Sequence, residues 1–187
     1  GSRYAVVVWG FRTITFEPVT WLGWLIFHGL DVAAVYRPAG DGGEVGGDFY
    51  DVFQVGEDDW AVVLGDVAGK GVDAAVLTSL VRYSLRAIAV RVEEPGEVLR
   101  ELNEVLMRSE TERFCTMTFL RLRRVDGAWI VAMSSGGHAP PLLAVPGEEP
   151  RPVGAYGSLV GVFETGIYPD SSTRGAFGLV LLKVASF

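Results

Sequence analysis

The sequence contains only one cysteine, two histidines and fewer basic than acidic residues. A single cysteine cannot form an internal disulfide, so Cys115, which lies in an apolar run, is expected to be a buried core residue of a protein from a reducing cytoplasm. Sixteen Lys and Arg against twenty-three Asp and Glu give a net charge of −7. This balance argues against a nucleic-acid partner, because neutralising phosphates requires a basic face.

Long hydrophobic runs are missing as well. The most apolar early run, Val19 to Leu30, is shorter than the roughly 20 apolar residues that cross a bilayer, so we expect no membrane span. The run favours a buried strand or a partner-facing edge, and its His28 has no metal-ligand neighbour. No signal peptide is evident, and Gly1-Ser2 resembles a remnant of an expression vector.

The patterns that are present predict one α+β domain. At 49% hydrophobic, the 187-residue chain has enough apolar surface for a single core. We predict strands near residues 32–36, 48–55, 60–67, 114–124, 128–135 and 142–145 and in the final apolar run, and helices near 73–91 and 95–108. Asp126-Gly127 joins two of the strands, as in a type I′ hairpin. Hairpins interrupted by two consecutive helices favour helices packed on stacked antiparallel sheets, not a doubly wound parallel sheet.

Two aspartates occupy matching positions on the first predicted hairpin. Asp48 and Asp66 are each nine residues from Glu57 in the connecting turn, so they should face each other with Cβ atoms about 5 Å apart. Like charges so placed are destabilising unless a cation lies between them. Oxygen ligands without His or Cys nearby favour Mg²⁺ or Mn²⁺. The alternative is a register shifted by one residue, which would send the carboxylates to opposite faces as solvated charges; spacing alone favours neither.

A glycine-rich turn follows the second aspartate. Gly46 and Gly47 allow backbone or ligand to come close to the pair, and AGKG leads into a helix N-terminus, where anions bind. Lys70 in this turn is a candidate phosphate contact or, equally, a solvated lysine. A nucleotide-type phosphate loop fits less well, because three rather than four residues separate Gly65 from Gly69 and no Ser or Thr follows the lysine.

Several longer motifs occur in order: VGGDFYDVF, GDVAGKG before an apolar helix, LNEVL, FCTMTF and GGHAPPLL. Over residues 31–161 they resemble the SpoIIE-like branch of the PPM metal-dependent serine/threonine phosphatases. The resemblance implies an αββα sandwich of antiparallel sheets flanked by helices, in a bacterial, cytoplasmic protein of sigma-factor regulation. It places residues 30–187 in the phosphatase domain. Residues 1–29 have no counterpart and are interpreted as a vector remnant, a linker, an edge strand, a homodimer contact or a rearranged terminus.

The resemblance also assigns roles to the site residues. Asp66 would bridge two Mg²⁺ or Mn²⁺ ions, the backbone carbonyl of Val67 would be a further ligand, and Asp48 would complete the surroundings of one ion. A water bridging the ions would attack phosphorus in line, without a covalent enzyme intermediate. The implied substrates are phosphoserine or phosphothreonine on anti-sigma-factor antagonists. Eukaryotic relatives have a histidine where this chain has Ala68, so the leaving serine would take its proton from water.

The C-terminal part departs from the family pattern. The family has a strand ending in a Thr-Asp-Gly type motif and a further acidic ligand, but this sequence has Lys183-Val184-Ala185 there, and Asp170 and Glu164 lie before the strand. The second ion would then lack ligands. Two alternatives follow: a protein serine/threonine phosphatase whose activity the missing motif impairs, or a catalytically impaired PPM fold that serves as a protein-binding regulatory module. His138, in GGHAPPLL, is expected to brace its turn and not to act in catalysis.

Overall fold

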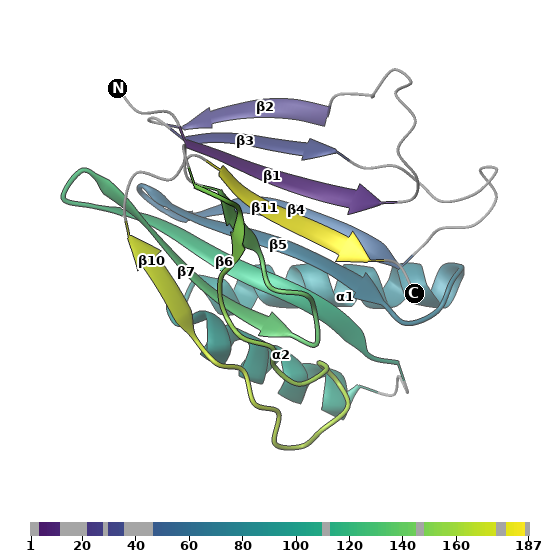
Figure 1. The fold of residues 1–187 in the computed structure, drawn as a ribbon. Coiled ribbons are helices and arrows are strands. Elements are labelled where there is room, and N and C mark those ends of the chain that lie inside the picture. The colour runs from purple at the N-terminus through teal and green to yellow at the C-terminus, as the bar shows by residue number, and fades with distance from the viewer. Residues whose placement is uncertain are drawn as a thin grey trace.

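The computed structural model describes residues 4–11, 22–27, 30–35, 47–109, 113–144, 148–174 and 179–185 (Figure 1). Its elements are β1 (Tyr4–Phe11), β2 (Leu22–Phe27), β3 (Leu30–Val35), β4 (Asp48–Gly56), β5 (Asp59–Val67), α1 (Val72–Ala89), α2 (Pro95–Arg108), β6 (Cys115–Val125), β7 (Ala128–Gly136), β8 (Leu142–Ala144), β9 (Arg151–Pro152), β10 (Ser171–Arg174) and β11 (Leu179–Ala185). The α+β prediction is confirmed, because both helices and the two predicted hairpins form where the patterns placed them.

A five-stranded sheet forms the centre of the fold, with strand order β10-β7-β6-β5-β4 and antiparallel pairing throughout. The turn between β6 and β7 has the predicted chemistry. Asp126 and Gly127 have φ angles of 51° and 77°, and a type I′ turn requires positive φ at both central residues. The local sequence therefore determines this hairpin.

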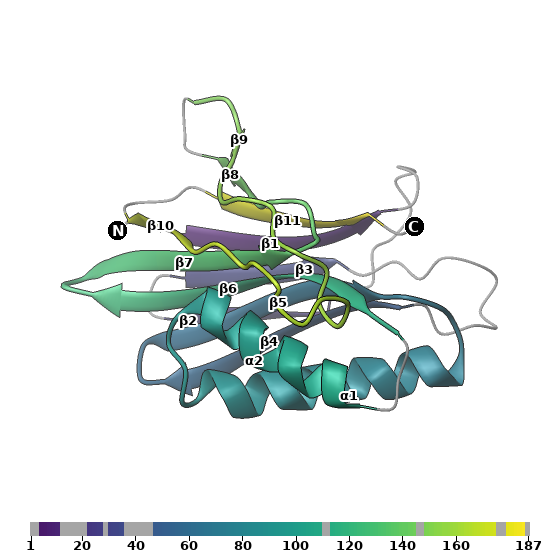
Figure 2. The same ribbon diagram turned by 90° about the horizontal axis from the view of Figure 1, so that it is seen from below.

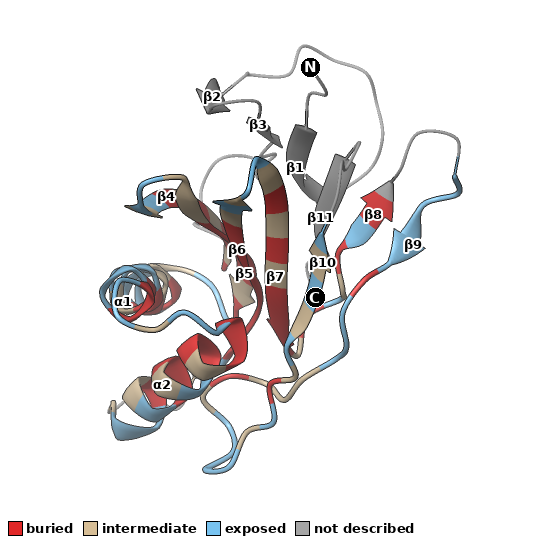
Figure 3. Ribbon diagram, turned by 90° about the vertical axis from the view of Figure 1, so that its left-hand side faces the viewer, coloured by how far each residue is buried: buried red, intermediate tan, exposed pale blue. Residues whose placement is uncertain are grey.

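The two helices pack against one face of the five-stranded sheet (Figure 2). The buried side of α1 repeats at helical spacing, with Leu77, Val81, Leu85 and Ile88 pointing to the sheet. Helix α2 begins with Pro95 at its first position, where the missing N–H costs nothing. The burial colours of Figure 3 show the same pattern, with the helix sides that face the sheet buried.

The other face of the five-stranded sheet carries a second apolar cluster. Val62, Leu64, Leu120 and Leu122 alternate along β5 and β6 with the residues that face the helices. Leu143 of β8 belongs to the same cluster. Since β8 lies in the second sheet, this cluster is the core between the two stacked sheets.

The second sheet has the order β2-β3-β1-β11-β8-β9. Here the prediction of purely antiparallel sheets is wrong, because β1 pairs in parallel with both β3 and β11. Residues 1–29, for which an edge strand was one of the interpretations, include β1 inside this sheet and β2 at its edge. The assignment of the domain itself to residues 30–187 stays a prediction.

Among the described residues, the helices cover the five-stranded sheet only, so the second helical layer of an αββα sandwich stays a prediction. Neither of these helices is long and apolar enough to cross a membrane. The elements that carry the candidate site are β4, β5, the start of α1 and the start of β6.

Candidate metal centre

Asp48 and Asp66 face each other across the open end of the β4–β5 hairpin, where they are direct partners in the register. The alternative register, shifted by one residue, is excluded by the pairing of Tyr50 with Leu64 and of Val52 with Val62. An irregularity between Gln54 and Gly56 at the turn does not reach the aspartates. The predicted juxtaposition of the two carboxylates is therefore confirmed.

The two aspartates lie on the face of the five-stranded sheet that packs against the second sheet. Asp66 lies two residues beyond Leu64, which belongs to the intersheet core, and Asp48 lies two residues before Tyr50, which packs against it. Both aspartates are half-buried, and the Oδ1 atom of Asp48 is shielded from solvent. The two carboxylates thus lie at the margin of an apolar core, where like charges repel more strongly than in water.

Gly47 brings further oxygen atoms to the same place. Its carbonyl accepts a hydrogen bond of 3.0 Å from the Val67 amide. A Cβ atom at position 47 would overlap the carbonyl oxygen of Val67 and come within 2.5 Å of Asp66 Oδ1. Only glycine fits this close approach, as the sequence predicted, whereas Gly46 lies outside the described residues.

The turn after β5 is held by the start of β6. The Ala68 amide donates a hydrogen bond of 2.9 Å to the Phe114 carbonyl. Gly69 and Gly71 have φ angles of 107° and 79°, which favour glycine. Lys70 is exposed on this turn, and its role as a phosphate contact stays a prediction.

Thr116 on β6 extends the row of aspartates, and His138, which follows β7, lies against it. Thr116 is the register partner of Asp66 on the side away from β4, and its Oγ1 lies 3.0 Å from Nδ1 of the buried His138. His138, expected to brace a turn, thus also holds a side chain beside the candidate ligand. Thr116 was not among the predicted site residues, although the FCTMTF motif lies on the strand that pairs with β5.

Cys115 begins β6 next to Val67, its register partner. The thiol is buried, as predicted, and burial followed by the negative charge of Asp66 raises the pKa of Cys115 above its ordinary value. A thiol of raised pKa remains protonated at neutral pH and is a poor nucleophile or metal ligand.

The other predicted or weighed carboxylates lie elsewhere. Asp170 Oδ1 accepts a hydrogen bond of 2.6 Å from the Gly96 amide at the start of α2, and Glu164 is exposed.

Strand β11, which includes Lys183-Val184-Ala185, ends on the same side of the molecule as β5 (Figures 1 and 2). Within the described ranges, no group of three or more His, Cys, Asp or Glu residues could hold a metal ion.

The donor set that the structure brings together consists of oxygen atoms only. Two facing carboxylates, with the Val67 carbonyl packed beside Asp66, are hard ligands of the kind that Mg²⁺ and Mn²⁺ bind. These ions usually keep several waters, so a protein needs to supply only a few ligands. The residues present therefore fit a divalent ion of this class.

Comparison with known proteins identifies relatives of this chain. The family described as Stage II sporulation protein E (SpoIIE) matches residues 56–183. Protein IcfG from Synechocystis sp. is 40% identical over 72 residues, which are 38% of this chain and 11% of IcfG. The phosphoserine phosphatase RsbU from Bacillus subtilis is 29% identical over 112 residues, which are 59% of this chain and 32% of RsbU. The chain therefore spans about a third or less of the length of these relatives.

Solved structures agree with these matches. The RsbU and RsbW domains of Rv1364c from Mycobacterium tuberculosis share 26% identity with this chain, with a TM-score of 0.58, over 71% of this chain and 37% of that chain. RsbX, whose structure was solved in complex with magnesium, shares the fold, with a TM-score of 0.53 at 14% identity, over 74% of this chain and 65% of that chain.

Proposed function

We propose, from the premise that this chain belongs to the SpoIIE family of PPM phosphatases, that it is a metal-dependent protein serine/threonine phosphatase. Its substrate would be phosphoserine or phosphothreonine on a cytoplasmic regulatory protein of the anti-sigma-factor antagonist type. The observation that carries the proposal is the position of Asp48 directly opposite Asp66. A relative named as a phosphoserine phosphatase supports the reaction class.

In this proposal Asp66 and the Val67 carbonyl hold Mg²⁺ or Mn²⁺, and Asp48 completes the surroundings of one ion directly or through water. When bound, the ions supply a water of lowered pKa and offset the charge on the phosphoryl oxygens. Gly47 keeps its side of the hairpin open so that the oxygens of Asp66 and Val67 can approach the same point. Ala68 cannot donate a proton, so the leaving hydroxyl takes its proton from solvent.

The second candidate function is a catalytically impaired PPM fold that binds a protein partner. It is favoured by the small donor set at the centre, because in the described part of the chain no group of three or more His, Cys, Asp or Glu residues could hold a metal ion. A centre of two ions needs more ligands than these. In this case the chain would recognise a partner without hydrolysing a phosphate ester.

The two candidates are separated by assaying a phosphoserine peptide with excess Mn²⁺ and by measuring Mn²⁺ binding by calorimetry. We expect Asp66→Ala to lower the Mn²⁺ affinity and the turnover by more than about 100-fold, since loss of a ligand exceeds the effect of losing a supporting residue. Glu104→Ala, on the exposed side of α2, is the control and should leave both unchanged. If the wild type and Asp66→Ala hydrolyse the peptide equally slowly, the phosphatase proposal fails and the binding module remains.

A further inference from the structure

We propose that Arg113 is a positioning residue of the metal centre, because its guanidinium orders the turn that directly follows Asp66 and Val67. The inference rests on the proposed function and extends it to a residue that the sequence motifs did not single out. Arg113 comes just before β6, and its side chain is 34% exposed.

Hydrogen bonds from one guanidinium join the two ends of the turn. Arg113 Nη1 donates to the Ala68 carbonyl at 3.0 Å, and Nη2 donates to Asp73 Oδ2 in the first turn of α1 at 3.1 Å. Ala68 is the residue after Val67, so the first bond acts next to a candidate ligand. The planar fork of arginine suits such a bridge, whereas the single ammonium of lysine does not.

The turn is shaped to receive this side chain. Gly69 lies between the two bonded residues with a φ of 107°, and a Cβ atom there would overlap Arg113 Nη1. The position thus requires glycine both for its backbone conformation and for the close approach of the guanidinium. The close approach of Arg113 therefore accounts for the glycine at this place in the GDVAGKG motif.

The backbone beside Arg113 orients the candidate carbonyl ligand. The Ala68 amide donates to the Phe114 carbonyl at 2.9 Å. In a planar trans peptide the N–H and the preceding C=O point in opposite directions, so this bond directs the Val67 carbonyl away from β6 and toward the side of Gly47. Residues 113 and 114 together hold both polar groups of Ala68.

A direct contact of Arg113 with the phosphate is the competing role. The structure favours positioning, because the guanidinium donates to the Ala68 carbonyl and to Asp73 and lies against Gly69. Loss of a phosphate contact would raise KM, whereas loss of a positioning residue would weaken metal binding and lower kcat at limiting metal.

The test compares Arg113→Gln and Arg113→Lys with Arg108→Gln, a matched arginine in the last turn of α2 that pairs with Glu104. We expect Arg113→Gln to weaken Mn²⁺ binding by about 10- to 100-fold, the usual effect of losing a residue that orients a ligand. Arg113→Lys should recover only a small part of this affinity, because one ammonium keeps the positive charge but cannot span both Ala68 and Asp73 as the guanidinium does. KM for the phosphoserine peptide at saturating Mn²⁺ should not change.

Amide hydrogen exchange of the metal-free proteins supplies the second measurement. Exchange at Ala68 and through the turn to α1 should rise in Arg113→Gln and not in Arg108→Gln. Asp73→Asn, which keeps the arginine and the exposed surface, should show the same change to a smaller degree. This variant preserves the test if Arg113→Gln does not fold.

The outcomes separate the two proposals. Unchanged Mn²⁺ affinity and exchange in the Arg113 variants, with a metal-binding wild type, would overturn the positioning role alone. A raised KM with unchanged Mn²⁺ affinity would replace it by a phosphate contact. A wild type that binds no Mn²⁺ would overturn the metal centre and the phosphatase proposal with it, whatever the exchange at the turn.

Discussion

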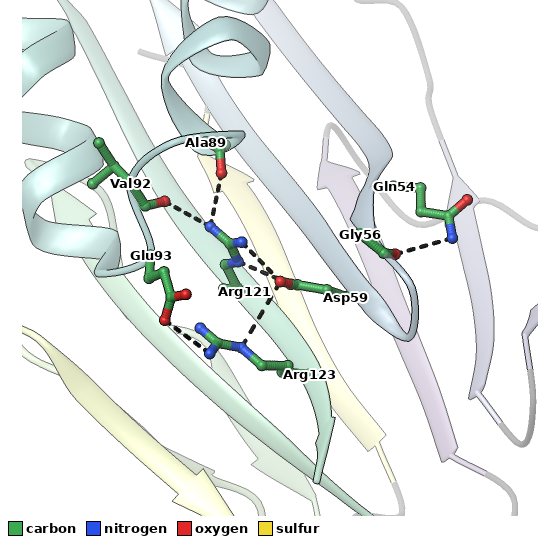
Figure 4. A network of polar contacts seen from close by, with 8 residues as sticks. All are labelled: Gln54, Gly56, Asp59, Ala89, Val92, Glu93, Arg121 and Arg123. Carbon is green, nitrogen blue, oxygen red and sulfur yellow. Dashed lines mark hydrogen bonds and ion pairs between the residues drawn. The ribbon is translucent and has the colours of Figure 1, made fainter.

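The carboxylates at the two ends of the β4–β5 hairpin have opposite kinds of neighbour, an arginine at the turn end and a second carboxylate at the open end. At the turn end, Asp59 receives two hydrogen bonds, of 2.8 and 2.7 Å, from the buried Arg121, which also donates to the carbonyls of Ala89 and Val92 (Figure 4). At the open end, Asp48 faces a second carboxylate, Asp66. The carboxylate at the turn end is thus held by a buried arginine, whereas the open end places two like charges opposite each other, a repulsion that a bound cation would relieve.

Asp51, between these ends, follows the stabilising pattern. It is buried on the helix-facing side of β4 and receives two hydrogen bonds from Arg86 of α1, at 2.8 and 2.7 Å. Arg86 also lies over the ring of Phe53, with its guanidinium carbon 4.8 Å from the ring centre. A count of carboxylates therefore does not separate candidate metal ligands from carboxylates that stabilise the fold, whereas the partner of each carboxylate does.

The largest expected effect is at the turn end of the hairpin. Arg121→Met should lower the free energy of unfolding by about 3–5 kcal/mol, because it leaves Asp59 and two carbonyls without their buried donor. Arg123→Met is the control, since Arg123 is 38% exposed and exposed ion pairs contribute at most about 1 kcal/mol. Urea unfolding of both variants measures the two free energies of unfolding. Equal losses of stability would show that the buried and the exposed arginine contribute equally.

Asp51→Asn should lower the free energy of unfolding at neutral pH by about 1.5–3 kcal/mol, the range for hydrogen bonds to charged groups. Burial by itself would raise the pKa of Asp51, but the hydrogen bonds of Arg86 and Arg82 hold it below its ordinary value of 3.8. A lowered pKa stabilises the fold above that ordinary value, and the contribution disappears as the pH falls through the folded-state pKa.

The check is urea unfolding of the wild type and Asp51→Asn from neutral pH downward. The difference between the two proteins should stay constant at neutral pH and shrink below pH 3.8. A difference that is the same at every pH would mean that the charge of Asp51 does not stabilise the contact between α1 and β4.

Two glycines, one at each end of the β4–β5 hairpin, differ in the space around them. Gly47→Ala should lower the free energy of unfolding by about 1–3 kcal/mol through overpacking, and it should weaken Mn²⁺ binding by displacing the Val67 carbonyl. Gly56→Ala is the matched control at the turn end, where a Cβ would meet Asp59 Cβ at an ordinary 3.6 Å. Thermal unfolding with and without Mn²⁺ measures both effects. If Gly47→Ala unfolds at the same temperature as the wild type, position 47 is not as crowded as the distance to the Val67 carbonyl oxygen indicates.

The smallest effect has the opposite sign. Asp48→Asn should raise the stability of the metal-free protein at low salt by about 0.2–1 kcal/mol, because it removes one of two facing like charges. The gain should decrease with added salt, while Mn²⁺ binding is lost. Asp126→Asn in the exposed β6–β7 turn should change neither, and a destabilised Asp48→Asn would show that the aspartate pair is structural.

Much of the fold near the site was predictable from local sequence. The register of Asp48 and Asp66 follows from their equal distance from Glu57, and the type I′ turn follows from Asp126-Gly127. Both helices follow from apolar spacing. These features depend on residues close together in the chain, so a linear pattern contains them.

The parts that were missed depend on contacts between distant residues. The parallel pairing of β1 with β11 joins opposite ends of the chain, and short β9 and β10 have no periodic signal. The role of Arg113 depends on its contact with Ala68, and that of Thr116 on its contact with His138. No spacing rule predicts which arginine or threonine meets a given turn.

By itself, then, the sequence determined the paired aspartates, the glycine turn and the order of helices and hairpins, because turn chemistry and periodicity act over a few residues. Only the tertiary structure decided which carboxylates receive hydrogen bonds from arginines, as Asp51 does from Arg86 and Asp59 from Arg121. That choice is made where β4 and β5 pack against α1 on one face and continue the intersheet core on the other. Burial on those two faces sets the cost of each charge.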